Sequence, residues 1–293
     1  MTLRNMRILA GEGLRMLFVN ARAKLFGLKK PSGNDIERCR QIVEDCYDKK
    51  LRCFRVTQRF GNYPVFYARD FGWCTQALIN LGHKPRVLSS LDYALKKYSK
   101  HKGIKVAINL RGLPFDFPDV YSPDSVAYLF RSLRIAEARS LIVEYKDFLN
   151  SEIKRFEGIA IGSNGLIQRK HFSGMRDYSV SKGSCYDMIM ACMLSDEIDK
   201  INKMIRADKI VKYGKNMKAK ANILDNTLAK YPLKKNLIKY FWTGNLIISP
   251  NQIYKAKVCM KDLTKIILHS RAILRVQILT SNKRLLYQLL YWV

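Results

Sequence analysis

The sequence lacks the features that mark several common classes of protein. Although 48% of its 293 residues are hydrophobic, no stretch reaches the roughly 18 uninterrupted apolar residues that a membrane span requires. Arg and Lys interrupt the first 30 residues at seven positions, which breaks up the apolar core of a secretory signal. We therefore expect a cytoplasmic protein without a membrane span. A basic amphipathic helix that lies on a membrane or a partner is the alternative for this segment.

Clustered metal ligands are also missing. The seven cysteines include no CxxC pair, and the four histidines are spread widely along the chain. Cys39 and Cys46 are seven residues apart on an expected helix, as are Cys185 and Cys192. This spacing favours buried thiols over zinc ligands. The sequence therefore predicts no metal site.

Acidic residues are scarce at both ends of the chain. The formal net charge of +29 is unevenly distributed: residues 1–33 carry +6, residues 34–199 also carry only +6, and residues 200–293 carry +17. A large positive charge favours nucleic acid as a partner, but here the middle of the chain is nearly balanced. We expect a basic N-terminal segment at 1–33, a helical domain at 34–245, and a basic, apolar tail at 246–293.

The middle of the chain has the apolar spacing of helices joined by loops rich in Gly and Pro. Helices are predicted at about 34–49, 71–81, 88–98, 122–133, 135–155 and 184–195, with another from 196 or 197. Asn34 or Asp35 can cap the first of these helices, and Ser122-Pro123 supplies an N-cap and a favoured first residue for the helix at 122–133. A short strand is predicted at 105–109, and a β-hairpin at 158–170 around Asn164-Gly165. Short helices alternate with longer ones, as a toroid of helical hairpins requires. In such a ring the loops 60–70, 103–122 and 171–183 would open at one end and line a binding cleft.

The first segment that could carry chemistry contains Arg69, Asp70 and Trp73 among aromatic residues at a helix entry. Aromatic faces stack on the C–H surface of a sugar, while a carboxylate and a guanidinium bind neighbouring hydroxyls. These three residues are therefore candidate sugar-binding residues. Alternatively, Asp70 is a helix N-cap with Arg69 as its surface partner.

The second segment runs from His171 to Asp187 and includes Arg176, Asp177 and Tyr178. Asp177 could act as a general acid if a cleft removes it from water and raises its pKa; a purely structural role is an equal alternative. Asp187 follows Ser184 by three residues, the spacing of a helix capping box. We therefore expect a structural role for Asp187.

The third segment, residues 109–121, places Arg111, Asp116 and Asp119 among aromatic residues. These side chains suit a polyhydroxylated ligand, although turns are rich in Asp and Pro in any case. The three segments lie at equivalent positions in the expected series of helices. Together they are therefore stronger evidence for a ligand-binding site than any one of them alone.

Two of these segments resemble motifs of the six-hairpin glycosidases. The run from Tyr67 to Gly72 is similar to the Arg-Asp motif of glucoamylase-type and amylo-α-1,6-glucosidase-type proteins, and the stretch 175–187 resembles the segment that carries their general acid. The resemblance covers roughly residues 34–245. It implies an all-α, (α/α)6 toroid-like fold with a minor β-hairpin, sugar binding by Arg69 and Asp70, and proton donation by Asp177. An Asp at the acid position is closer to trehalase-type members than to glucoamylases, which use Glu.

The resemblance ends where a second catalytic carboxylate is needed. Inverting members use a general base about 6.5–9.5 Å from the acid, and it would come from a late hairpin. Residues 246–293 contain one acid, Asp262, and no Gly, so the toroid is expected to be incomplete. We hypothesise that this tail, which includes an amphipathic helix at 258–278, is an out-of-frame or diverged replacement of the original C-terminus. Translating the other two frames past Asn245 and finding no toroid-like continuation would reject that idea. The alternative is a genuine basic helical tail that docks a partner.

The sequence thus predicts a glycoside hydrolase-like protein for α-linked glucosides or oligosaccharides, with an impaired active site as one possibility. Secondary contacts to the sugar would come from Asp116 or Asp119. The further candidate substrate-binding residues are Arg111, His171, Arg176 and Tyr178. No cofactor is implied, because this chemistry needs two carboxylates and water. The main alternative is a basic, non-enzymatic protein that binds nucleic acid or an anionic surface through its ends. A helical scaffold without a ligand is the third hypothesis.

Overall fold

The structure is a computed structural model that describes residues 3–27, 31–57, 61, 63–174, 180–213 and 222–242. The helices are α1 (Leu3–Phe26), α2 (Asp35–Cys46), α3 (Ala68–Asn80), α4 (Lys84–Lys100), α5 (Pro123–Ile135), α6 (Arg139–Glu144), α7 (Lys146–Ala160), α8 (Cys185–Tyr213), α9 (Leu233–Leu237), the 3₁₀-helix η1 (Thr227–Lys230) and the π-helix η2 (Ile238–Trp242). The strands are β1 (Tyr47–Asp48), β2 (Cys53–Phe54), β3 (Phe66–Tyr67), β4 (Ala107–Ile108), β5 (Pro114–Phe115), β6 (His171–Ser173) and β7 (Val180–Lys182).

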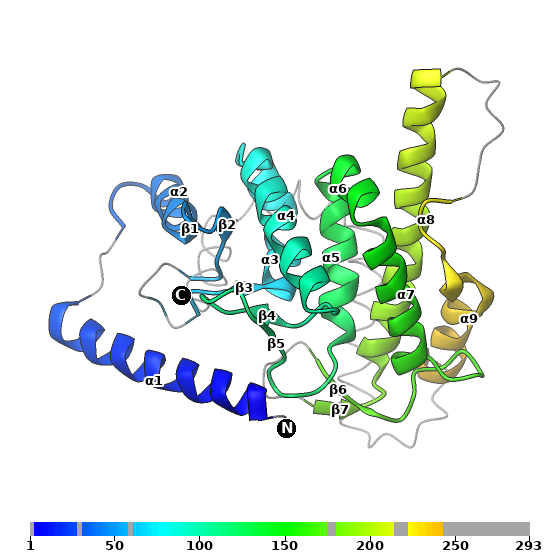
Figure 1. Cartoon of the computed structure of the whole chain (residues 1–293), viewed down its shortest axis with the longest axis horizontal. Helices are drawn as coiled ribbons and strands as arrows, with labels where there is room; N and C mark the ends of the chain where they lie inside the picture. Colours follow the sequence, from blue (N-terminus) through cyan, green and yellow to red (C-terminus); the bar gives the residue numbers. More distant parts are fainter. Residues whose placement is uncertain are drawn as a thin grey trace.

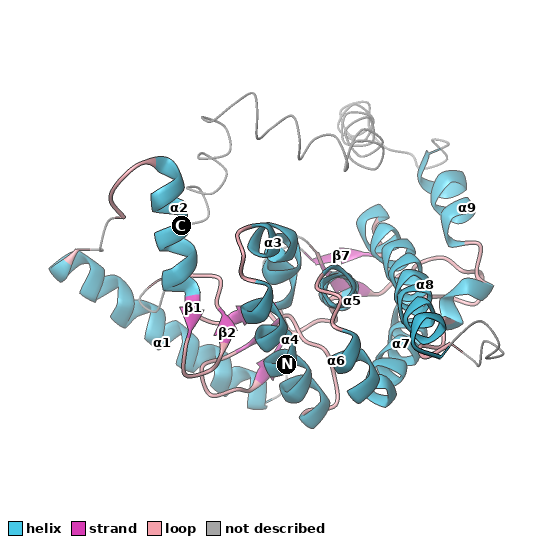
Figure 2. Cartoon of the chain, turned by 90° about the horizontal axis from the view of Figure 1, so that it is seen from above, coloured by secondary structure: helices cyan, strands magenta, loops and turns pink. Residues whose placement is uncertain are grey.

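Six of the helices form two rows. Seen from above, α3, α5 and α8 lie side by side in one row, and α4, α6 and α7 lie in a second row next to it (Figure 2). The prediction of a mainly helical fold is confirmed. The part of the chain that the structure describes does not close these rows into a ring, so the (α/α)6 toroid stays a prediction. None of its helices is long and apolar enough to cross a membrane.

The centre of the core is α5, which packs against α3 on one side and α8 on the other. Nearly every residue from Pro123 to Leu133 is buried. An isolated helix on a surface shows one apolar stripe, whereas a helix surrounded by protein is buried all round. Ala127 and Ser132 are small enough to let the neighbouring helices approach closely, and apolar burial of this kind is the dominant stabilising contribution to folding.

Buried polar contacts fix α5 against its two neighbours. The Thr75 hydroxyl of α3 lies 3.0 Å from the Ser132 hydroxyl of α5, and each hydroxyl also donates to a carbonyl of its own helix. On the other side, Arg134 forms an ion pair with Glu197 of α8, with 3.1 Å between Nη2 and Oε1. Because buried polar groups need partners, these pairs favour one register of the three helices.

A small antiparallel sheet, in the order β3-β4-β5, holds the beginning of α3. Phe66 pairs with Ile108, and Ala107 pairs with Phe115. The backbone N–H of Ala68, the first residue of α3, donates to the carbonyl of Val106 at 2.9 Å. The helix therefore begins directly from a strand, in the region that Figure 1 shows beneath α3 and α4. Of the three strands, only β4 lies in a stretch predicted as a strand; β3 and β5 fall in predicted loops.

Two predicted helix boundaries are wrong. The single helix expected at 135–155 is two helices, α6 and α7, that follow a turn with Glu137 at φ +52°. This turn directs Leu141 and Ile142 into the core. Conversely, no break occurs at 196 or 197, because α8 continues and Glu197 is buried against Arg134 instead of opening a helix. The other predicted helices between residues 34 and 133 lie at α2, α3, α4 and α5, with shifts of up to four residues at their ends.

The hairpin predicted at 158–170 is shorter than expected. Helix α7 extends to Ala160, and a single antiparallel bridge between Ile161 and Ile167 closes the turn at Asn164-Gly165, where the pairing was predicted. The positive φ of Gly165 (+72°) is the local feature that the Asn-Gly pair predicted. A second antiparallel pair, β6–β7, lies a few residues further along the chain and was not predicted.

The close approach of α3 and α5 gives a test of this packing. A Cβ on Gly72 would lie 2.5 Å from Cβ and 2.9 Å from Cγ of Tyr128. We therefore expect Gly72→Ala to lower the free energy of unfolding by about 1–3 kcal/mol, because the helices must separate. The matched control is Gly158→Ala in α7, where no atom lies within 4 Å; it should stabilise by about 0.5–1 kcal/mol. Equal urea midpoints for the wild type and Gly72→Ala would contradict the packing.

Candidate functional site

The first turns of α3, α5 and α8 meet at one end of the inner row. Each first turn carries one carboxylate: Asp70 in α3, Asp124 in α5 and Asp187 in α8. The N-terminal end of a helix has a partial positive charge and free N–H groups, so it stabilises a negative charge. Direct contacts among Arg69, Asp124 and Tyr186 establish that these ends converge.

A buried ion pair lies at the centre of this region. The Arg69 Nε atom is 2.7 Å from Asp124 Oδ2, and the two side chains are only 5% and 0% exposed. The Ser122 hydroxyl donates to Asp124 Oδ1 and also contacts Ser125 at 3.0 Å. Ser122 occupies the N-cap position of α5, as predicted, but its side chain bonds to Asp124 instead of capping the helix. Asp124 thus receives hydrogen bonds from a cation and from hydroxyl groups.

Two tyrosines and a tryptophan continue this network toward the surface. The Tyr186 hydroxyl donates to Asp124 Oδ2 at 2.9 Å, and it also interacts with Tyr128. Burial, together with the nearby Asp124, raises the pKa of Tyr128 to about 12. The Tyr128 ring packs on Trp73 with 5.4 Å between the ring centroids and 37° between the planes. Trp73 is 56% exposed, so one end of this chain of contacts is open to solvent.

Asp187 forms the predicted capping box at the start of α8. Its Oδ2 accepts hydrogen bonds from the backbone N–H (2.9 Å) and the hydroxyl (2.7 Å) of Ser184, while the Asp187 N–H donates to Ser184 Oγ at 3.3 Å. The expected structural role is therefore confirmed. Burial raises the pKa of this carboxyl group. Its second oxygen, Oδ1, has no hydrogen-bond partner among the residues that the structure describes.

The structure distributes the remaining predicted residues over several places. Asp70 is half-buried at the start of α3, and Asp119 is half-buried between β5 and α5. Arg111 is exposed on the β4–β5 turn, where its N–H donates to Asn109 Oδ1 at 3.0 Å. His171 is exposed at the start of β6. The predicted general acid Asp177 and the predicted sugar ligands Arg176 and Tyr178 lie outside the described residues. The predicted roles of all these side chains stay predictions.

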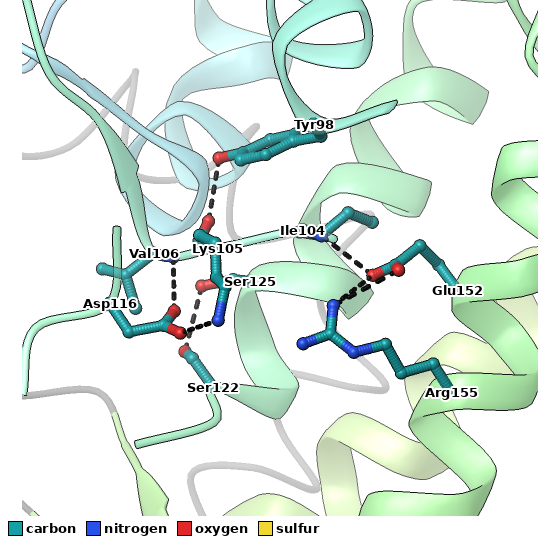
Figure 3. Close-up of polar contacts among 9 residues, drawn as sticks. All are labelled: Tyr98, Ile104, Lys105, Val106, Asp116, Ser122, Ser125, Glu152 and Arg155. Atoms are coloured by element: carbon teal, nitrogen blue, oxygen red, sulfur yellow. Dashed lines mark hydrogen bonds and ion pairs between the residues drawn. The ribbon is translucent and has the colours of Figure 1, made fainter. Parts of the chain in front are cut away.

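Asp116 belongs to a second polar network, which Figure 3 shows between the 103–122 segment and α7. Its carboxylate is 2.5 Å from Lys105 Nζ and accepts the Val106 N–H at 3.1 Å. Burial raises the pKa of Asp116 in spite of the opposing charge of Lys105. Tyr98 of α4 donates to the Lys105 carbonyl at 2.8 Å. These contacts hold the 103–122 segment in place. They also give the buried Asp116 carboxylate its partners within the protein, so no ligand is needed to explain its position.

Glu152 and Arg155 of α7 complete the second network (Figure 3). Glu152 is buried, accepts the Ile104 N–H at 2.9 Å, and pairs with Arg155 at 3.3 Å. A side chain at Gly103 would overlap the Arg155 guanidinium, so glycine leaves room for that group. The Arg155 guanidinium also lies 5.6 Å from the centre of the Tyr121 ring, a cation–π distance. The segment before α5 is therefore fixed at several points.

Sequence reasoning missed Asp124 and Tyr128, which connect Arg69 and Trp73. The Ser122-Pro123 signal predicted the start of α5, and an acidic residue in a first helical turn has an ordinary structural explanation. The signal that could have identified Asp124 is the apolar pattern of the residues that follow it. This pattern indicates a helix that is buried on every side, and an acid in the first turn of such a helix is buried as well. Such an acid needs a buried cationic partner.

Comparisons with known proteins give no family for this chain. No family model matches it, and neither a curated protein nor a solved structure matches it. Across the described ranges of the chain, no group of three or more His, Cys, Asp or Glu side chains is arranged to hold a metal ion. The resemblance to six-hairpin glycosidases therefore rests on the sequence motifs alone.

The Arg69–Asp124 pair can be tested by a double-mutant cycle. Asp124→Ala leaves a buried guanidinium without its partner, so we expect a loss of about 3–5 kcal/mol in the free energy of unfolding. The double variant Arg69→Ala/Asp124→Ala should lose less than the sum of the two single variants, because neither charge is then left alone.

The control for this cycle is the exposed pair of Arg86 and Glu44, whose atoms are 2.6 Å apart. Glu44→Ala should cost less than about 1 kcal/mol, because water screens this pair. Additive effects of the two substitutions at Arg69 and Asp124, measured by urea unfolding, would show that the buried charges do not interact.

A pH dependence follows from the raised pKa of Asp187. The folded protein holds this proton more tightly than the unfolded chain, whose Asp has a pKa of about 3.9. The resulting stability is fully present below that value and is lost as the pH rises through the raised pKa. Asp187→Asn cannot lose a proton, and its amide oxygen can still accept the Ser184 N–H. Its stability relative to the wild type should therefore increase as the pH rises from below 4 toward neutral.

Urea unfolding of the wild type and Asp187→Asn across this pH range measures the difference, since the other carboxyl groups titrate equally in both proteins. A constant difference between the two unfolding free energies would contradict a raised pKa for Asp187.

Proposed function

We propose that this protein is a carbohydrate-binding relative of the six-hairpin glycosidases, and that it binds the end of an α-linked glucan or oligosaccharide where α3 and α5 begin. The observation that carries the proposal is the exposed indole of Trp73, which is held against Tyr128 at the entry of α3. Because this ring packs against Tyr128 and is still open to solvent, it is available for stacking with a ligand.

The chemistry around Trp73 supports a sugar as the ligand. An aromatic face stacks on the C–H surface of a sugar ring, and polar groups at its edge bind the hydroxyls. Asp70 is half-buried in the same helical turn as Trp73. Cys74 and Gln76 continue the solvent-facing side of α3, and neither brings a charge that would repel a neutral sugar.

The predicted role of Arg69 takes a more specific form in this proposal. Its guanidinium is paired with Asp124, so a direct hydrogen bond to a sugar requires that pair to rearrange. In the arrangement described, Arg69 acts as a positioning residue: it holds Asp124, which holds Tyr186, which contacts Tyr128 beneath Trp73. Hydrolysis is a further part of the proposal, with Asp177 as the proton donor.

Affinity measurements on Trp73 test the proposal. A glycan array on the purified full chain should identify an α-glucan or α-linked oligosaccharide. Trp73→Ala should then weaken binding of that glycan about tenfold, because a stacking contact of about 0.5–1.5 kcal/mol is lost along with the apolar area. Tyr240→Ala is the matched control, since Tyr240 is another large aromatic residue with 41% exposure; its affinity should not change.

Turnover assays on α-glucosides and trehalose, run alongside the array, separate binding from hydrolysis. Binding without turnover would retain the carbohydrate site and reject the hydrolase part. An array without any bound glycan, or equal affinities for Trp73→Ala and the wild type, would reject the site itself.

A further inference from the structure

Helix α1 exposes apolar side chains along its length. It lies beside the helical body, apart from the two rows (Figure 1). Its exposed large apolar residues, with their exposed fractions, are Met6 (48%), Leu14 (70%), Leu17 (69%), Phe18 (76%), Leu25 (77%) and Phe26 (79%). Single exposed apolar residues are ordinary on a protein surface, whereas a series along one helix marks an interaction surface.

These side chains share one face of the helix. Leu14, Leu17, Phe18 and Leu25 are separated by three, four and seven residues, which places them above one another on a helix of 3.6 residues per turn. The half-buried positions fall on the opposite side, where Arg15 pairs with Glu12 at 2.7 Å. Arg15 also donates to the Gly61 carbonyl at 3.5 Å. The polar pair of α1 is thus turned toward the protein and the apolar face is turned away from it.

The charge on the outer side of α1 has one sign. The exposed charged side chains that the structure describes on this helix are Arg7, Arg22 and Lys24, and the one acid, Glu12, is half-buried in its pair with Arg15. Helical spacing places Arg22 and Lys24 on opposite borders of the apolar face. A second copy of α1 would bring like charges together, so this surface favours an anionic partner over its own copy.

We propose that α1 docks on the surface of a membrane that contains anionic lipids. The apolar face enters the boundary between headgroups and acyl chains, and Lys24 at the border of this face extends to the lipid phosphates. The helix lies in the plane of the membrane, since it is not apolar enough to cross one. Anionic lipid attracts each Lys or Arg near the surface, and this attraction weakens as salt screens it.

A lipid surface suits the shape of this face better than an acidic protein does. From Met6 to Phe26 the face extends about 30 Å at 1.5 Å per residue, with the side chains standing free in solvent. A fluid interface accepts a straight apolar face of this length without a matching groove. A protein partner would need an apolar groove of the same length with acidic groups on both borders.

Co-sedimentation of the full chain with lipid vesicles tests the proposal. The probes are vesicles of phosphatidylcholine with and without phosphatidylserine. We expect binding only when phosphatidylserine is present, with affinity falling as salt rises. The variant Leu17→Gln/Phe18→Gln should bind the anionic vesicles about tenfold more weakly, because two apolar side chains no longer enter the lipid.

The matched control is Ile36→Gln/Val143→Gln, which removes two exposed apolar side chains of α2 and α6 without changing the charge. Its binding should equal that of the wild type. All four side chains are at least half exposed, so thermal unfolding should be unchanged in both variants and loss of binding cannot come from loss of folding.

Three outcomes would overturn the proposal. Equal vesicle binding by the wild type and the α1 variant would place lipid binding in another basic part of the chain. Absence of binding to anionic vesicles would exclude a lipid surface as the partner. A change in oligomeric state on size-exclusion chromatography, with unchanged vesicle binding, would show that the α1 face joins two copies of the chain.

Discussion

The guanidinium of Arg69 and the carboxylate of Asp124 are buried together between α3 and α5, where neither charge reaches water. A buried charge without a partner is strongly destabilising, so each helix must begin where the other can supply the opposite charge. Tyr186 of α8 bonds to the same carboxylate, which extends the requirement to a third helix. The ends of the inner row, with Trp73 open to solvent beside them, are thus positioned by an electrostatic constraint in addition to apolar packing.

The sequence predicts local features of the fold well and long-range features poorly. The start of α2 follows from the Asn34 cap, and the start of α5 follows from Ser122-Pro123, with Pro123 at the first helical position, because these signals depend on neighbours along the chain. The turn that separates α5 from α6 has a positive φ at Glu137, and glutamate gives no signal for that conformation. The continuity of α8 through Glu197 depends on Arg134, 63 residues earlier, which no pattern within α8 can reveal.

The same limit applies to the candidate site. The sequence motifs identified Arg69, Asp70, Trp73 and Asp116 as one chemical group, since all are polar or aromatic residues near helix entries. The structure separates them into two networks: Arg69 connects through Asp124 and Tyr128 to Trp73, whereas Asp116 pairs with Lys105 and supports the segment before α5. Residue types indicate which chemistry is possible, but the partners that the fold supplies, 55 residues away for Arg69 and 11 residues away for Asp116, decide which side chains remain available for it.

The hydrogen bond from the Ala68 N–H to the Val106 carbonyl has a consequence for the evolution of this surface. It fixes the first residue of α3 through main-chain atoms, which every sequence supplies, and the β3-β4-β5 pairing behind it is also made by main-chain atoms. The helix can therefore keep its origin and direction while its solvent-facing side chains, such as those at 73, 74 and 77, are exchanged. Selection can thus alter what this surface recognises without first having to rebuild the scaffold that presents it.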